Sequence, residues 1–274
     1  MRSSSIVVLL LALLQPVVCI SQSTSAQLVG HDDELVSELL SVKTGDQLAA
    51  SSLLSNHRNL ITRRICDSLL QAATTCSALG NSARSLFLCE IAKQAAKQLD
   101  DKKLLAFVFY KTGRMPFERD NISTAIKEFL QSKTLFEEAH SPRDLIYILG
   151  ELGALHIYSA DYKKAEEYSE QSLALAASLK NGSESAGALP DEYGMAFAWS
   201  NLGNVAKWKA DYDSALDDFR KSLELWRELR QRGFWSAGNI ADALVDIGHV
   251  YQVMGDHIQA LNYLSQAGYS KDID

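Results

Sequence analysis

The stretch WSNLGNVAKWKADYDSALDDF, residues 199–219, decides the fold because its spacing recurs in two other segments. In each copy an apolar residue is followed three positions later by an aliphatic residue, then by a glycine, and twelve residues further by an alanine. A turn of a small residue and an aspartate lies between glycine and alanine at a constant offset. The glycine–alanine pairs are Gly153 and Ala165, Gly203 and Ala215, and Gly248 and Ala260. Such agreement indicates an internal repeat.

Each copy has the pattern of two amphipathic helices joined by a short turn. Trp199, Leu202 and Ala206 fall on one face of a first helix, and Ala215 and Phe219 share a face of a second. A glycine inside a helix costs about 1 kcal/mol relative to alanine, so its recurrence needs a packing reason. We expect the alanine twelve residues later to approach the glycine backbone closely. We expect the aspartate of the turn to cap the second helix.

This pattern resembles the tetratricopeptide repeat (TPR) family, whose signature is W-x-x-L-G-x-x-Y…A-x-x-x-F. Trp199, Leu202, Gly203, Ala215 and Phe219 match it, whereas Ala206 stands where the family has tyrosine. The resemblance implies an all-α fold, a right-handed superhelix (α-solenoid) of helical hairpins. It places repeats at about 101–140, 145–178, 193–228 and 239–268, within a TPR region of 101–270. The preceding segment, 27–100, is expected to be helical and to hold one degenerate TPR-like hairpin.

The copies upstream of the strong motif are weaker. Ala125 and Phe129 mark a second helix whose first helix is predicted at Lys103 to Tyr110, with Gly113 to Asn121 as an extended loop. An amphipathic segment at Asp33 to Val42 is expected to cap the stack.

The N-terminus has the pattern of a secretory signal peptide, residues 1–26. Arg2 supplies the positive charge, Ile6 to Leu14 is an unbroken apolar run, and cleavage is expected after Ala26. An uncleaved anchor is the alternative, but nine apolar residues are fewer than the roughly 20 that a spanning helix needs. A lipoprotein at Cys19 is disfavoured by Val18 before it. The mature chain is therefore expected to have no integral membrane segment and to be extracytoplasmic, either periplasmic or secreted.

Composition and motifs exclude several function classes. The net charge of −7 and the pI near 5.4 argue against nucleic-acid binding, which rests on clustered Lys and Arg. Nucleotide-binding loops, a GxSxG elbow and an HExxH motif are missing from the sequence. The six histidines lack metal-ligand spacing. We therefore predict a non-enzymatic protein with no catalytic residues, no metal and no cofactor.

The resemblance implies a concave groove lined by the first helix of each hairpin, which would bind a protein or peptide. Aromatic rings there would bury area at low entropic cost, and asparagine can pair with a peptide backbone. The alternative is that these side chains simply pack against the neighbouring repeat. The predicted groove residues are Tyr147, Tyr158, Phe197, Asn201, Asn204, Trp208, His249 and Gln252.

Three cysteines, Cys66, Cys76 and Cys89, remain after cleavage, and none has CxxC spacing. The TPR register places Cys76 and Cys89 on facing helices, which makes a disulfide between them one hypothesis. Buried free thiols are the other.

Two further functions stay open at this stage. The chain stops at Asp274, seven residues after Ala267, without the polar capping helix that solenoids use. It therefore resembles the N-terminal arm of an exported TPR protein of the CHAT type, in which a caspase-like peptidase follows the repeats. Self-association of the uncapped last hairpin is the other alternative.

Overall fold

The computed structural model describes residues 31–114, 122–179, 191–234 and 237–271, so the predicted signal peptide lies outside the described residues. The described part is all α-helical apart from one 3-10 turn, η1 at Arg58–Leu60. Its twelve helices are α2 (His31–Ser41), α3 (Gln47–Asn56), α4 (Arg63–Ala78), α5 (Ser82–Gln98), α6 (Lys102–Gly113), α7 (Ile122–Glu138), α8 (Pro142–Tyr158), α9 (Tyr162–Leu179), α10 (Asp191–Trp208), α11 (Tyr212–Gln231), α12 (Ala237–Met254) and α13 (His257–Lys271).

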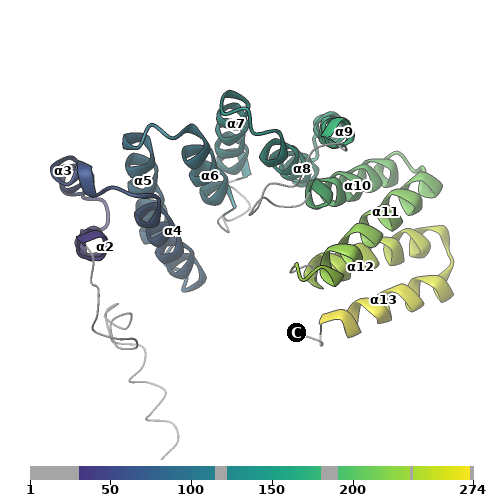
Figure 1. Cartoon of the computed structure of the whole chain (residues 1–274). Helices are drawn as coiled ribbons and strands as arrows, with labels where there is room; N and C mark the ends of the chain where they lie inside the picture. Colours follow the sequence, from purple (N-terminus) through teal and green to yellow (C-terminus); the bar gives the residue numbers. More distant parts are fainter. Residues whose placement is uncertain (1–30, 115–121, 180–190, 235–236, 272–274) are drawn as a thin grey trace, which may run out of the picture.

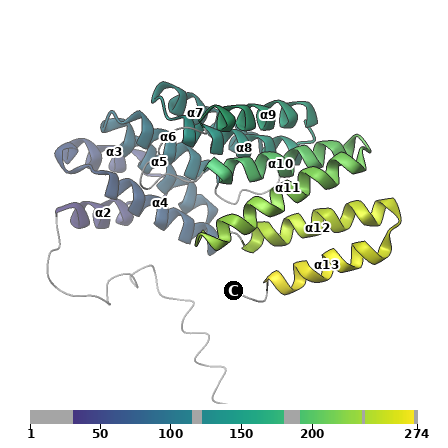
Figure 2. The same cartoon turned by 45° about the vertical axis from the view of Figure 1, so that its right-hand side comes forward.

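The helices pack as sequential hairpins along an arch (Figure 1). α6 and α8 lie on the inner side of the arch, and α7 and α9 lie on its outer side. The turned view places α2 and α3 at one end and α12 and α13 at the other (Figure 2). The expected all-α hairpin array is confirmed.

The turns between paired helices form as the sequence predicts. The side chains of Asp161, Asp211 and Asp256 accept hydrogen bonds from the backbone N–H three residues later, at 3.3, 3.2 and 3.0 Å. Each bond satisfies a donor that the first turn of a helix leaves without an intrahelical partner. The residue before each aspartate has a positive φ, of 58° at Ala160, 59° at Ala210 and 83° at Gly255. This left-handed residue reverses the chain direction between the helices.

The recurrent glycines have a packing reason, but it differs from the expected one. A Cβ added at Gly203 would lie 2.8 Å from ring carbons of Phe219, and one at Gly248 would lie 2.8 Å from Leu264 Cγ. The corresponding neighbour of Gly153 is Ser169 Oγ, at 2.7 Å. A side chain that needs the space therefore stands sixteen residues after each glycine, and at Gly153 Asn201 Nδ2 of α10 also occupies it, at 2.5 Å. The alanine at twelve residues contributes only its carbonyl, at 3.4 Å for Ala165 and 3.3 Å for Ala260.

Gly113 also packs against the side chain sixteen residues later, and its position corrects the predicted start of the following loop. The predicted loop began at Gly113, but this residue ends α6 and packs against the ring of Phe129, sixteen residues later. The loop position was wrong because the residues before Gly113 lack the W-x-x-L pattern of the strong copies.

Buried serines join the two helices of three hairpins. The hydroxyls of Ser132, Ser172 and Ser222 are fully buried and donate to the carbonyls of Ala106, Ile146 and Ala196, at 2.8, 2.9 and 2.8 Å. Each donor stands 26 residues after its acceptor. Each serine thus adds a directional contact to the close packing of its hairpin.

The inner helices differ in how closely they approach one another. α8 and α10 touch through their backbones, since a Cβ added at Gly150 would lie 2.9 Å from the Gly194 carbonyl oxygen. α10 and α12 are not a closely packed pair, although α11 contacts both. This difference opens a space between α10 and α12.

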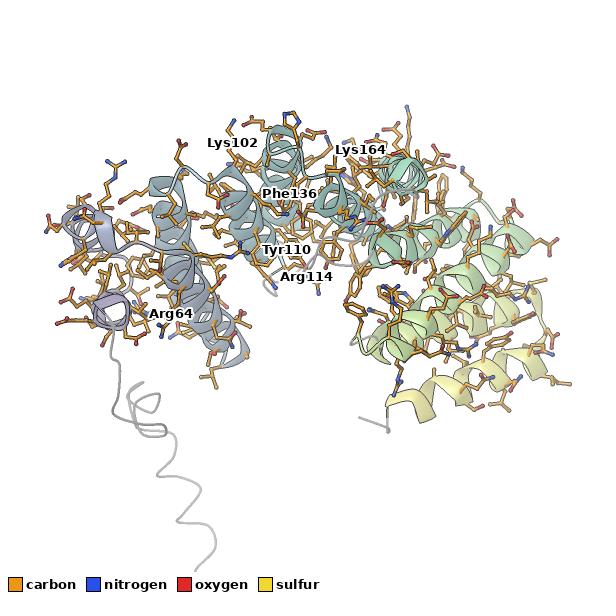
Figure 3. All side chains as sticks on the ribbon, in the orientation of Figure 1. Arg64, Lys102, Tyr110, Arg114, Phe136 and Lys164 are labelled. Atoms are coloured by element: carbon orange, nitrogen blue, oxygen red, sulfur yellow. The ribbon has the colours of Figure 1, made fainter. Side chains whose placement is uncertain are left out.

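The N-terminal helices cover the other end of the array. Leu35 and Leu39 of α2 are buried in the same core as Ile65 and Leu69 of α4. Arg64, labelled in Figure 3, donates to Asp33 Oδ1 at 2.6 Å across this contact. The amphipathic segment predicted at Asp33 to Val42 therefore packs on α4 as helix α2.

Candidate binding groove

A cavity of about 390 Å³ lies where α8, α10 and α12 face one another. We call this space the groove cavity. Apolar and aromatic side chains alternate with carboxamides and carboxylates around it. Its lining residues are Ala154, Ile157, Tyr158, Phe197, Ser200, Asn201, Asn204, Trp226, Asn239, Asp242, Ala243, Val245 and Asp246.

Rigid aromatic packing forms the floor of the groove cavity. Trp226 of α11 is buried and fills the space between α10 and α12. Phe197 and Tyr193 meet its ring edge-to-face, at centroid distances of 5.0 and 4.9 Å. Such arrangements favour one orientation for each ring. Tyr158 of α8, in contrast, is 74% exposed at the rim, where its ring is available for contact with a ligand.

Two asparagines of α10 line the groove cavity. Asn201 is only 4% exposed, and its Nδ2 donates to the Gly150 carbonyl of α8 at 2.9 Å. Asn204 donates from Nδ2 to the Ser200 carbonyl at 3.0 Å. Among the described residues nothing donates to either Oδ1 atom. The carboxamides therefore offer acceptors to a ligand.

The wall formed by α12 is acidic. Asp242 and Asp246 stand one helical turn apart and both line the groove cavity. Asp246 forms an ion pair with Lys207 Nζ of α10 at 3.5 Å. Burial raises the pKa of Asp246, and the nearby Lys207 only partly offsets that effect.

Four of the eight groove residues predicted from the sequence line this cavity: Tyr158, Phe197, Asn201 and Asn204. The sequence-based list missed Trp226, Asn239 and Asp246. The i, i+4 spacing of Asp242 and Asp246 on one helix face was the available signal for the acidic wall. Trp226 carried no such signal because it belongs to an outer helix and reaches the groove only through the gap between α10 and α12.

The other four predicted residues lie outside the groove cavity. Trp208 is 61% exposed, but its ring stacks on Tyr162 of α9 with the centroids 4.7 Å apart. His249 and Gln252 are exposed on α12. Tyr147 is buried and belongs to a polar cluster between α6 and α8.

This polar cluster joins Tyr110, Tyr147, Glu151 and Arg114. The Tyr147 hydroxyl donates to Glu151 Oε1 at 2.8 Å, and Arg114 pairs with the same carboxylate. Burial raises the pKa of Tyr110 above its usual range, so its hydroxyl stays protonated. Figure 3 shows Tyr110 and Arg114 on the inner side of the arch. Each member is paired with another, so the cluster ties α6 to α8.

The cysteines Cys66, Cys76 and Cys89 are free thiols in the structure, which contains no Cys76–Cys89 bond. Cys66 and Cys89 are buried, and burial raises the pKa of each thiol to about 12. Both therefore stay protonated and unreactive near neutral pH.

The described residues hold neither a candidate metal site nor a candidate membrane-spanning helix. In the described ranges no group of three or more His, Cys, Asp or Glu side chains could hold a metal ion. None of the helices α2 to α13 combines the length and the apolar character needed to cross a bilayer.

The comparisons with known proteins agree with this architecture. The family model described as Tetratricopeptide repeat matches residues 194–267, which run from α10 into α13. No curated protein matches the chain.

Several solved structures have a similar fold. BtubC (BKLC) from P. vanneervenii is 16% identical, with 89% of this chain and 92% of that chain covered and a TM-score of 0.62. A Signal Transduction ATPase with Numerous Domains (STAND) with a tetratricopeptide repeat sensor, from Pyrococcus horikoshii, is 14% identical, with 83% and 34% covered and a TM-score of 0.58. A Rap protein complexed with Competence and Sporulation Factor is 14% identical, with 87% and 69% covered and a TM-score of 0.57. Likeness at these identities shows the fold alone, an all-α array of TPR-like hairpins.

Proposed function

We propose that this chain is a non-enzymatic scaffold that binds an extended segment of a protein partner in the groove between α8, α10 and α12. The observation that carries the proposal is the groove cavity itself, where free carboxamide oxygens stand beside the aromatic rings of Phe197 and Tyr158. Rings supply contact area at low entropic cost, and the oxygens can accept from peptide N–H groups. The Rap protein with its bound factor supports the proposal by its fold alone.

The test fills the groove cavity without disturbing the outer face. Ser200→Trp places a large side chain in the cavity lining, whereas Ser178→Trp makes the same change on the exposed side of α9. Proteins retained by the immobilised parent are quantified by mass spectrometry beside those retained by each variant, after equal helicity has been checked by circular dichroism. We expect Ser200→Trp to lose a partner that Ser178→Trp keeps. Identical retained sets for all three proteins would contradict the groove assignment.

We also propose that the chain acts in an extracytoplasmic space, periplasmic or secreted. The support is the sequence pattern of residues 1–26, with Arg2 before the apolar run Ile6 to Leu14. The mass of the exported protein tests this, because cleavage near Ala26 gives a chain that begins at Gln27. Retention of the full-length mass inside the cell would contradict export.

Self-association is a second candidate function because α13 leaves an apolar face open. Leu216 of α11 is 5% exposed because the following hairpin covers it, whereas Leu261, at the matching place of α13, is 70% exposed. Ile258 beside it is 83% exposed. A second copy docked on this face would remove both from water.

A sensor arm of a larger enzyme is the third candidate, and the repeat sensor of the STAND protein supports it by fold. Reading the gene beyond the codon for Asp274 tests this candidate. A following enzyme domain, such as a CHAT-type peptidase, is the expected result, and a stop codon there would contradict it.

A further inference from the structure

We propose that the acidic wall of the groove cavity binds an arginine or lysine side chain of the peptide segment that the groove takes up. This inference rests on the function proposed above and adds the chemistry of the ligand. The recognised feature is a cation on an extended peptide. The cation would enter between the two aspartates of α12 and the two asparagines of α10.

The charges around the groove cavity favour a cation. Asp242 and Asp246 contribute two carboxylates, and Lys207 Nζ pairs with Asp246 alone, at 3.5 Å. Asp242 has no ion pair in the part of the chain that the structure describes. His249 also faces Asp246 from one turn further along α12. Two carboxylates against the one ammonium of Lys207 leave an excess of negative charge at the cavity.

The hydrogen-bonding groups of the opposite wall favour the same ligand. Asn201 and Asn204 each commit one Nδ2 hydrogen to a backbone carbonyl of the protein, and each Oδ1 is left without a donor among the described residues, so both side chains keep an acceptor for a ligand. Asn201 is 4% exposed, so a ligand donor that reaches its Oδ1 is largely removed from water. Guanidinium and ammonium groups have several donors and no acceptor. Carboxylates on one wall and carboxamide oxygens on the other therefore suit a basic side chain better than an acidic or a neutral one.

The aromatic residues favour arginine over lysine. The rings of Phe197 and Tyr158 flank the space in front of the acidic wall. A planar guanidinium stacks on such rings and can donate to a carboxylate with two parallel bonds. An ammonium provides only a compact charge there.

The experiment begins with a phage-displayed library of random dodecapeptides, selected on the whole mature chain. We expect enriched peptides to share an arginine or lysine at one position. One enriched peptide is then synthesised, and its affinity is measured for the parent, for Asp242→Asn and for Asp242→Asn/Asp246→Asn. Each lost carboxylate should weaken binding about tenfold. The control Glu170→Gln/Asp213→Asn removes two exposed carboxylates from the outer helices and should leave the affinity unchanged.

A second peptide, with citrulline in place of the arginine, makes the test specific. Citrulline has the shape of arginine but no charge. The citrulline peptide should therefore bind the parent about tenfold more weakly than the arginine peptide does. The two peptides should bind Asp242→Asn/Asp246→Asn with nearly equal affinity. Equal losses from citrulline in both proteins would overturn the acidic-wall assignment even if the single substitutions weaken binding.

The remaining outcomes separate the two proposals. The enriched peptides could fail to bind Ser200→Trp and yet share no basic residue and bind the aspartate variants as well as the parent. That result would overturn this inference and leave the proposed groove function standing. A library that yields no peptide sensitive to Ser200→Trp overturns both. Binding of spermidine that depends on Asp242, with no peptide enriched, identifies a small polyamine as the ligand and contradicts the peptide assignment.

Discussion

Gly203 illustrates how one residue controls the fit of a hairpin. Replacing it with alanine adds a carbon that would lie 2.8 Å from the ring of Phe219. Overpacking of a core costs about 1–3 kcal/mol and outweighs the roughly 1 kcal/mol that alanine contributes to helix propensity. We expect Gly203→Ala to lower the free energy of unfolding by about 1 kcal/mol, measured by urea denaturation.

The matched control is Gly238→Ala, near the start of α12, where an added Cβ meets no atom within 4 Å. This change should be neutral or stabilising by up to about 1 kcal/mol. A similar effect of both substitutions would mean that the contact with Phe219 does not govern the site.

His156 makes stability depend on pH. Burial is the main cause that lowers the pKa of its imidazole, and the carboxylate of Asp161, at 3.6 Å from Nδ1, only partly opposes this shift. Nδ1 of His156 has no hydrogen-bond partner among the described residues. The unfolded chain therefore binds the proton more readily than the folded one, and stability falls as the pH drops through about 6.5. We expect urea midpoints to fall less between pH 7.5 and 5.5 in His156→Phe than in the parent. The exposed His257→Gln serves as the control, and an equal fall in all three would contradict the prediction.

At the residue scale, the sequence could place side chains relative to a glycine but not relative to other hairpins. Counting from Gly203 correctly brought Asn201 and Asn204 to the cavity. The same counting could not show that Trp208 stacks on Tyr162, because that contact depends on how two hairpins are rotated against each other. Trp226 was missed because it belongs to an outer helix and reaches the groove only through the gap between α10 and α12.

The turn between α10 and α11 is the element that sequence analysis described best, and it also contains strain. Ala210 has φ of 59°, a region that costs an L-residue about 1–2 kcal/mol. Gly255 occupies the corresponding place in the last hairpin. We expect Ala210→Gly to raise the free energy of unfolding by up to about 1 kcal/mol, after allowing for the greater freedom of glycine in the unfolded chain.

The comparison for this turn is Ala206→Gly, in the last turn of α10. It should destabilise by about 1 kcal/mol because the backbone of Ala206 is helical. The midpoint of thermal denaturation is measured for both variants and for the parent. A lower midpoint for Ala210→Gly would show that the turn is not strained.

Helix positions followed from the sequence wherever the turn chemistry was strong. The aspartate caps at Asp161, Asp211 and Asp256 form where they were expected. The end of α6 was misplaced because Gly113 was taken for a loop residue, and only its contact with Phe129 shows its role. The contact between each glycine and the residue sixteen positions later could not be predicted from the sequence, because that residue is phenylalanine, serine or leucine in different hairpins. The contact is evident only from the positions of the side chains.

At the scale of the whole molecule, the open face of α13 predicts concentration-dependent association. The average mass from sedimentation should rise with concentration for the parent and stay that of a monomer for Ile258→Lys/Leu261→Lys. Leu79→Lys is the control, because this side chain is 77% exposed at the end of α4, away from α13. A constant monomer mass for the parent would remove self-association from the candidate functions.

The contact between Gly150 and Gly194 also has a mechanical meaning. The backbones of α8 and α10 are in direct contact there, so we expect the two hairpins that contain them to move together. The last hairpin is attached to them through α11 and lacks a matching seam between α10 and α12. Under a pulling force we therefore expect α10 and α12 to separate before α8 and α10 do. The groove cavity lies between α10 and α12, so a ligand bound there would be expected to resist that separation.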